Sequence, residues 1–209
     1  MRRALTLIEL IFSMVIIALA FTVLPKILQV SAKHAVTMLK EEAMSDAVAM
    51  VGFAKSLPWD EQNTQSDDIL HTDAAASNRY KCDSTTHYRV GGFAGSRGCF
   101  QNLSASTIGS ESGESDPDDL DDFNGLTKSI SNANGTRRYT IKVRVCYVDD
   151  AMEPFANKCR SGSTSDIKYL AVSVAPQTKQ QLLGKTIASF WYFSSNIGQI
   201  HINRRPWRK

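Results

Sequence analysis

The chain has 209 residues, of which 43% are hydrophobic and 22% are charged, and its formal net charge at pH 7 is +3. Once the apolar N-terminal segment is set aside, this length leaves room for one soluble domain with its own core and for no second full domain. The basic residues are spread along the chain, so the totals argue against a nucleic-acid-binding protein, and we do not expect nucleic acid to be a partner.

An apolar run from Leu5 to Leu24 dominates the N-terminus and contains one charged residue, Glu9. A helix over this run is about 30 Å long, which matches the hydrocarbon thickness of a bilayer. Arg2 and Arg3 precede it, and the positive-inside rule therefore keeps the N-terminus in the cytoplasm and places the chain after the run on the other side. We expect a transmembrane span at residues 5–24.

The same run also fits two other kinds of segment. One is a secretory signal peptide that is cleaved after Ala20, in the motif Ala18-Leu19-Ala20, and the other is a plain uncleaved anchor. Glu9 argues against both, because a charge at membrane depth is costly unless it finds a partner. The signal-peptide alternative would make the protein a conventionally secreted, disulfide-bonded periplasmic binding protein.

The stretch Ala4-Leu5-Thr6-Leu7-Ile8-Glu9-Leu10, after a very short basic leader, resembles the cleavage and methylation signature of type IV prepilins and pseudopilins. The resemblance implies that residues 1–4 are a leader, that a prepilin peptidase cuts between Ala4 and Leu5, and that Leu5 becomes the methylated N-terminus. It also implies that Glu9 is the family's assembly glutamate. The family usually has Gly where Ala4 stands and Phe where Leu5 stands.

The cut would supply Glu9 with a counter-charge. Cleavage after Ala4 leaves an α-amine on Leu5 at the end of an apolar helix, and a carboxylate one turn along that helix is the available partner for this cation. In the family the amine is thought to belong to a neighbouring subunit. The pair would then set the axial register of stacked helices, which is the best-attested use of a buried ionic group.

The helix is expected to continue beyond the membrane. Pro25 removes one helical hydrogen bond without preventing continuation, and Pro58 disfavours helix at Leu57. We predict one helix over residues 5–57, with a transmembrane first half and an amphipathic second half. In the second half apolar residues recur at intervals of three and four: Ala32, Ala35, Val36, Leu39, Ala43, Ala47, Val48, Val51, Ala54 and Leu57.

Strands are expected only after this helix. Residues 59–79 are polar and without pattern, which predicts a loop, whereas Arg138–Val148 alternates between apolar and polar residues as a half-buried antiparallel strand does. A helix followed by strands, with no β-α-β alternation, predicts an α+β fold in which the amphipathic half-helix covers an antiparallel sheet. Residues 58–209 would form a soluble, β-rich, pilin-like periplasmic domain. The predicted strands are His87–Val90, Arg138–Val148, Ile167–Ala175 and Lys185–Phe193.

Four cysteines follow the apolar run and show no C-x-x-C spacing, which argues against structural zinc. Their place beyond the membrane favours two disulfides in an oxidising compartment, with reduced buried cysteines as the alternative. Three connectivities exist, and we favour the local pairs Cys82 with Cys99 and Cys146 with Cys159, because each closes a loop rich in Gly, Ser or Asn.

The most acidic stretch, ESGESDPDDLDD over residues 111–122, does not have the EF-hand spacing. It could still form a calcium loop of another kind, with Gly125 at a tight turn, and a solvated acidic loop is the alternative. No cofactor is required, and calcium is the one candidate. Such loops occur in some pseudopilins, and the stretch resembles a turn of some MSHA-type minor pilins. The candidate ligands are Asp116, Asp118, Asp119, Asp121 and Asp122.

Signatures of enzymes are missing from the sequence. It has no Gly-rich phosphate loop, no G-x-S-x-G and no H-E-x-x-H motif, and the S-x-x-K match at residues 165–168 lacks the other elements of its family. We therefore do not expect an enzyme.

The basic C-terminus, residues 204–209, could contact DNA or an acidic partner, although short basic tails are usually frayed.

The combined prediction is a structural subunit, a minor pilin of an MSHA-like type IV pilus. A pseudopilin of a type II secretion system is the alternative, because both share the same N-terminal chemistry. The expected partners are the prepilin peptidase, the inner membrane and other pilin or pseudopilin subunits, which would be bound through the N-terminal helix.

Overall fold

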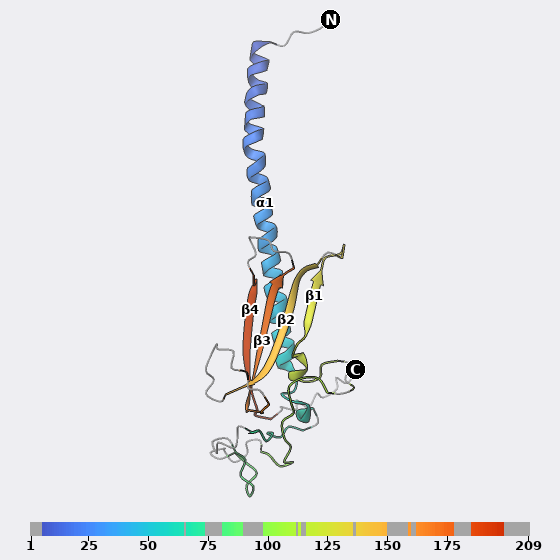
Figure 1. The fold of residues 1–209 in the computed structure, drawn as a ribbon. Helices are drawn as coiled ribbons and strands as arrows, with labels where there is room; N and C mark the ends of the chain where they lie inside the picture. Colours follow the sequence, from blue (N-terminus) through green and yellow to red (C-terminus); the bar gives the residue numbers. More distant parts are fainter. Residues whose placement is uncertain are drawn as a thin grey trace, which may run out of the picture.

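The computed structural model describes residues 6–64, 66–73, 81–89, 98–111, 113, 116–135, 137–149, 159, 162–177 and 185–198. One long helix is followed by a four-stranded antiparallel sheet of order β1-β2-β3-β4, and the helix covers one face of that sheet (Figure 1). The α+β prediction is confirmed. The elements are α1 (Leu7–Ser56), β1 (Thr127–Ser131), β2 (Arg137–Val148), β3 (Ile167–Pro176) and β4 (Ala188–Ser195).

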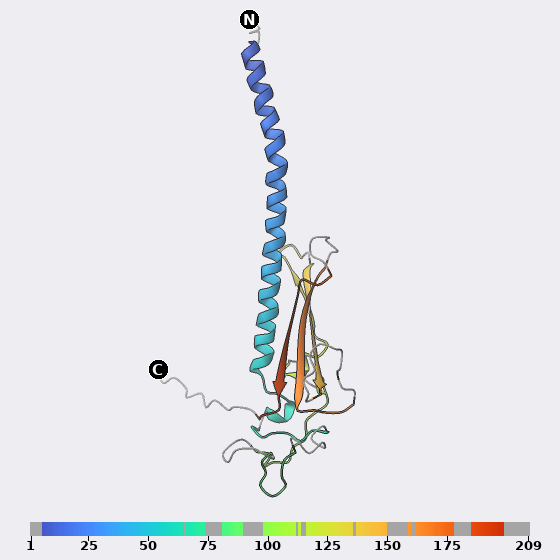
Figure 2. The same cartoon turned by 90° about the vertical axis from the view of Figure 1, so that its left-hand side faces the viewer.

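Helix α1 is 50 residues long and continues through Pro25 without a break. Its first half projects beyond the sheet, and its second half lies along the sheet (Figure 2). The helix ends at Ser56 because Leu57, the residue before Pro58, is extended, with φ −84° and ψ 164°. This end lies within one residue of the predicted one. Below, the sheet, the half-helix on it and the loops around them are called the head.

Small side chains bring α1 close to the sheet. Ala43, Ala47 and Ala54 are fully buried, and they face the inward side chains of β3, which alternate with more exposed ones. Val48 is exposed, although the apolar pattern had included it, because it lies about 100° around the helix from Ala47. The Tyr139 hydroxyl of β2 also donates a hydrogen bond of 2.6 Å to Asp46 of the helix.

One of the four strand predictions was wrong, and one strand was not predicted. In the stretch predicted as His87–Val90, the described residues form only an isolated bridge between Cys82 and Arg89, and His87 has a φ of 57° that interrupts extended backbone. The structure instead has β1, whose sequence TKSIS carries one apolar residue and so gives little signal of alternation. Within the predicted loop of residues 59–79, residues Glu61–Asn63 form the short 3-10 helix η1.

Candidate functional site

The N-terminal site of the predicted processing is partly described. Ala4 and Leu5 lie outside the described residues. Glu9 lies in the first turn of α1, three positions after the N-cap Thr6, and is exposed. This spacing is that of a capping box, but the Thr6 side chain makes no capping hydrogen bond. Among the described residues Glu9 forms no ion pair.

The apolar half of α1 is fully exposed. Leu7 is 79% exposed and Leu28 70%, and the other large apolar side chains between them are likewise open. Soluble monomers rarely expose so large a contiguous apolar surface. Within the part of the chain that the structure describes, α1 is the one helix long and apolar enough to span a membrane. A membrane or other helices would have to cover this surface.

Both favoured disulfides are formed. Cys82 pairs with Cys99, and Cys146 pairs with Cys159. The first disulfide packs with Ile69 in a small apolar cluster of its own, separate from the main core. The second starts from the outer face of β2. The bridges span 17 and 13 residues of sequence, and each restricts the unfolded chain by closing a loop.

The acidic stretch divides into exposed and buried carboxylates. Asp116 and Asp118 are exposed, whereas Asp119, Asp121 and Asp122 are buried. Asp119 and Asp122 accept backbone N–H groups of their own turn at 2.8–3.3 Å, and Asp121 is directed to a lysine. Among the described residues, no three Asp, Glu, His or Cys side chains are arranged to hold a metal ion. Calcium binding by this stretch stays a prediction.

That lysine is Lys168 of β3, which is completely buried beneath the helix end. Its ammonium donates to the Trp59 carbonyl at 2.7 Å, to Asp60 Oδ2 at 3.0 Å and to Asp121 Oδ1 at 2.5 Å. These three acceptors use all three N–H bonds of the ammonium. The cation also lies 4.3 Å from the centroid of the Trp59 ring, in a geometry that adds a cation–π attraction.

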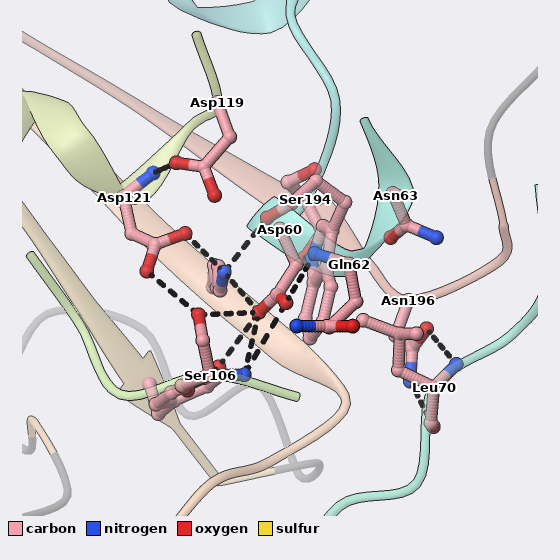
Figure 3. Close-up of polar contacts among 12 residues, drawn as sticks. Asp60, Gln62, Asn63, Leu70, Ser106, Asp119, Asp121, Ser194 and Asn196 are labelled. Carbon is pink, nitrogen blue, oxygen red and sulfur yellow. Dashed lines mark hydrogen bonds and ion pairs between the residues drawn. The ribbon is translucent and has the colours of Figure 1, made fainter. Parts of the chain in front are cut away.

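The same carboxylates hold a neighbouring loop. Asp60 accepts the backbone N–H of Ser106 at 3.0 Å and its hydroxyl at 3.1 Å, and Figure 3 shows Asp60, Asp121 and Ser106 directed toward one point. Tyr147 donates its hydroxyl to the Ser106 carbonyl at 2.8 Å, and burial, followed by the charge of Asp60, raises the pKa of Tyr147 and keeps it a neutral donor. We refer to Asp60, Ser106, Asp121, Tyr147 and Lys168 as the lysine cluster.

The lysine cluster joins the chain after α1, the loop at Ser106, the 3-10 helix η3 (Asp121–Phe123) and two central strands. Its carboxylates and ammonium are all engaged with one another or with backbone groups. This arrangement fixes the loops beyond the end of α1 to the sheet. The lysine cluster is therefore a structural junction.

Asp119 adds a further carboxyl beside this junction. Burial first, and then the charge of Asp121, raise its pKa to about 9. Its Oδ1 accepts two backbone N–H groups, whereas its Oδ2 is buried and has no hydrogen-bond partner. The carboxyl is therefore protonated at neutral pH in the folded state, although it would be ionised in the unfolded chain.

We predict that Asp119→Asn stabilises the protein at alkaline pH. Between the ordinary value of 3.8 and about 9, folded Asp119 holds a proton that the unfolded state has lost, so folding stability falls as the pH rises through this window. Asparagine keeps the Oδ1 acceptor and does not titrate. The melting temperature of the full chain in detergent should rise by roughly 5 °C at pH 8 and by less at pH 5.

The matched control for this prediction is Asp118→Asn, because Asp118 is the exposed neighbour with the same side chain. Surface substitutions of this kind usually change stability by less than about 0.5 kcal/mol. A pH profile of Asp119→Asn that runs parallel to the wild-type profile would contradict the assignment of a neutral Asp119.

A second buried polar side chain, that of Asn196, joins the end of β4 to the backbone around Leu70. Asn196 is fully buried; its Oδ1 accepts the Leu70 N–H at 3.1 Å, and its Nδ2 donates to the Leu70 carbonyl at 2.7 Å and to Asp166 at 3.0 Å. Asp166 in turn forms an ion pair with Arg89. The amide thus replaces a strand neighbour for the backbone around Leu70.

Sequence analysis did not identify Lys168 or Asn196. For Lys168 a signal existed, because strand alternation gives it the same face as Leu170 and Val172, both of which are buried. A lysine at such a position requires buried carboxylates elsewhere in the chain. No comparable pattern marks Asn196, which lies just after the last strand.

Comparison of the chain with protein-family models, with curated proteins and with solved structures gives no match. The architecture alone, a long apolar N-terminal helix on an antiparallel sheet, is compatible with a pilin-like fold.

Proposed function

We propose that this protein is a structural subunit of a pilin-like filament, a minor pilin held in the inner membrane until its N-terminal helix enters the assembly. A prepilin peptidase would cut between Ala4 and Leu5. The observation that carries the proposal is Glu9, a carboxylate in the first turn of a 50-residue helix whose apolar half is exposed among the described residues.

The position of Glu9 supports an intermolecular role. An exposed apolar helix can be buried either by lipid or by the apolar helices of other subunits. A carboxylate in that surface is costly in both settings unless a cation meets it. The amine created at Leu5 of a neighbouring chain would be such a cation. The ion pair could form at only one axial register between neighbouring helices.

The continuity of α1 supports the same proposal over conventional secretion. Ala18 and Ala20 lie within an unbroken helix that runs from Leu7 to Ser56. Cleavage after Ala20 would remove Glu9 and still leave exposed apolar residues such as Ile27 and Leu28 on a secreted domain. Such a surface favours aggregation unless it is covered.

The mass of the N-terminal peptide tests the proposal. Protein recovered from bacterial membranes with an active prepilin peptidase should yield a peptide that begins at Leu5 and carries one methyl group. Cells without that peptidase should yield the uncut chain. A peptide that begins at Phe21 in both strains would overturn the proposal and favour a secreted binding protein.

The machine that uses the subunit requires a second measurement. The acidic turn at residues 116–122 underlies the expectation of an MSHA-like pilus, and a type II secretion pseudopilus is the other candidate. Deletion of the gene should abolish surface filaments in the first case and the export of folded proteins in the second.

A further inference from the structure

The charges of the head are segregated, which the net charge of +3 conceals. The four strands contain six Lys and Arg residues and no Asp or Glu. The chain from Asp60 to Asp122 contains thirteen Asp and Glu residues and four Lys and Arg. Its described parts lie largely at the end of the head that is remote from the start of α1 (Figure 1). We refer to this region as the acidic end.

Two of these six cations lie on the face of the sheet that is turned away from α1, whereas Lys168 is buried on the other face against Asp60 and Asp121. Lys142 and Arg144 are exposed and alternate with buried residues of β2, so both side chains lie on the outer face. Arg144 is directly opposite Ala171 in the ladder, and Ala171 is directly opposite Trp191. A cation and an indole therefore flank one small residue across three strands.

Trp191 belongs to an aromatic group on this outer face. It is 48% exposed, and its ring centroid lies 5.6 Å from that of Phe193, which in turn lies 5.3 Å from that of Tyr169. We refer to Lys142, Arg144, Trp191 and Phe193 as the basic face. Trp and Arg are enriched at protein–protein interfaces, and here a half-exposed Trp191 that packs on Phe193 shares one sheet face with Arg144.

We propose that the basic face binds the acidic end of a second copy of this chain. The proposal rests on the proposed function, because it identifies the head surfaces that meet when subunits stack. Opposite charges on two surfaces give such a contact its specificity and its register. Since exposed cations on the sheet and exposed carboxylates at the acidic end occur in one molecule, the head is complementary to its own copy.

The shape of the molecule allows this contact. Helix α1 leaves the head at one end only, and the acidic end is the opposite one (Figure 2). Copies with parallel helices, shifted along the helix axis, bring the acidic end of one head beside the sheet of the next. Asp116 and Asp118 are exposed carboxylates of that end.

The contact would be heterologous, because the basic face meets a different surface on its neighbour. Repetition of a heterologous contact that does not close into a ring generates an open helical array. The head contact would therefore extend the same assembly that the N-terminal helices begin. It would also weaken as salt increases, since both surfaces are exposed.

Crosslinking between two tagged copies of the full chain in membranes tests the proposal. One copy carries Ser173→Cys on the outer face of β3, and the other carries Pro117→Cys next to Asp116 and Asp118. The described cysteines are all in disulfides, so a bismaleimide should join only the introduced thiols. We expect a product from this pair, and none when Asn134→Cys in the β1–β2 turn replaces Pro117→Cys.

Charge reversal provides the decisive comparison. Arg144→Glu should lower the crosslinking yield about tenfold, and Asp118→Arg in the partner copy should restore it. The matched control is Lys128→Glu, the same reversal on a strand residue that pairs with Ile141 and so belongs to the other face. Equal yields for Arg144→Glu and Lys128→Glu would overturn the proposal, as would a yield no higher than that of Asn134→Cys.

Other occupants give different results in the same assay. If an oligo-dT strand abolishes the crosslink and quenches Trp191 fluorescence, the basic face binds nucleic acid and the proposal is overturned. The N-terminal peptide is measured in the same samples. Cleavage at Leu5 without a crosslink overturns only the head contact, whereas a chain that begins at Phe21 but still crosslinks overturns the filament function and leaves the contact.

Discussion

Lys168→Met is expected to destabilise the protein by about 3–5 kcal/mol, because it leaves buried carboxylates without their counter-charge. Asp60 and Asp121 are each within 1% of complete burial, and both contact the Lys168 ammonium. The melting temperature of the full chain in detergent should fall by roughly 10 °C or more. The deficit should shrink at acidic pH, where protonation removes the unpaired charges.

Lys142→Met is the matched control for this substitution. It makes the same chemical change in the adjacent strand, but Lys142 is exposed on the outer face, and its effect should stay within about 0.5 kcal/mol. Addition of Asp121→Asn to Lys168→Met should recover part of the loss. Equal melting temperatures for the two lysine variants would contradict the ion pairing assigned to the lysine cluster.

The main elements could be predicted because their signals are local. An apolar run of membrane length, an interval of three and four residues after it, and Pro58 together define α1. Strict alternation defines β2 in the same way. The edge strand β1 was missed because only Ile130 among its five residues is apolar. Its extended form depends on pairing with β2, which is a tertiary effect.

The lysine cluster could not be assembled from the sequence, because its members come from distant segments. Lys168 lies 108 residues from Asp60 and 47 from Asp121. Alternation could mark Lys168 as inward-facing, but nothing local indicates which carboxylates it would meet. In the acidic stretch, Asp119 and Asp122 accept backbone N–H groups of their own turn, which its composition did not indicate, and calcium binding there stays a prediction.

For Glu9, the sequence suggests a role that the structure of a single chain does not reveal. Its position one turn from a predicted cut gives it a chemical partner, and a single copy does not supply that partner in the described residues. On the proposed function, the partner of this carboxylate belongs to a neighbouring molecule.

Glu9→Gln is accordingly expected to leave processing intact and to prevent assembly. The amide retains the size of the carboxylate but cannot neutralise the amine of the neighbouring chain, which would then be a lone cation among apolar helices. Loss of one partner of a buried ion pair costs about 3–5 kcal/mol, which corresponds to a loss of roughly a hundredfold or more in incorporation. The amount of subunit in sheared surface filaments, relative to the membrane pool, measures this loss.

The control is Glu41→Gln, which makes the same change at an exposed position of α1 beyond the predicted span. Both variants should show the N-terminal peptide that begins at Leu5, because the cut precedes either residue. Only Glu9→Gln should accumulate in the membrane without entering filaments. If it enters them as well as Glu41→Gln does, the carboxylate has no part in subunit register, and the reason for a charge within this apolar helix must lie in its insertion or its cleavage.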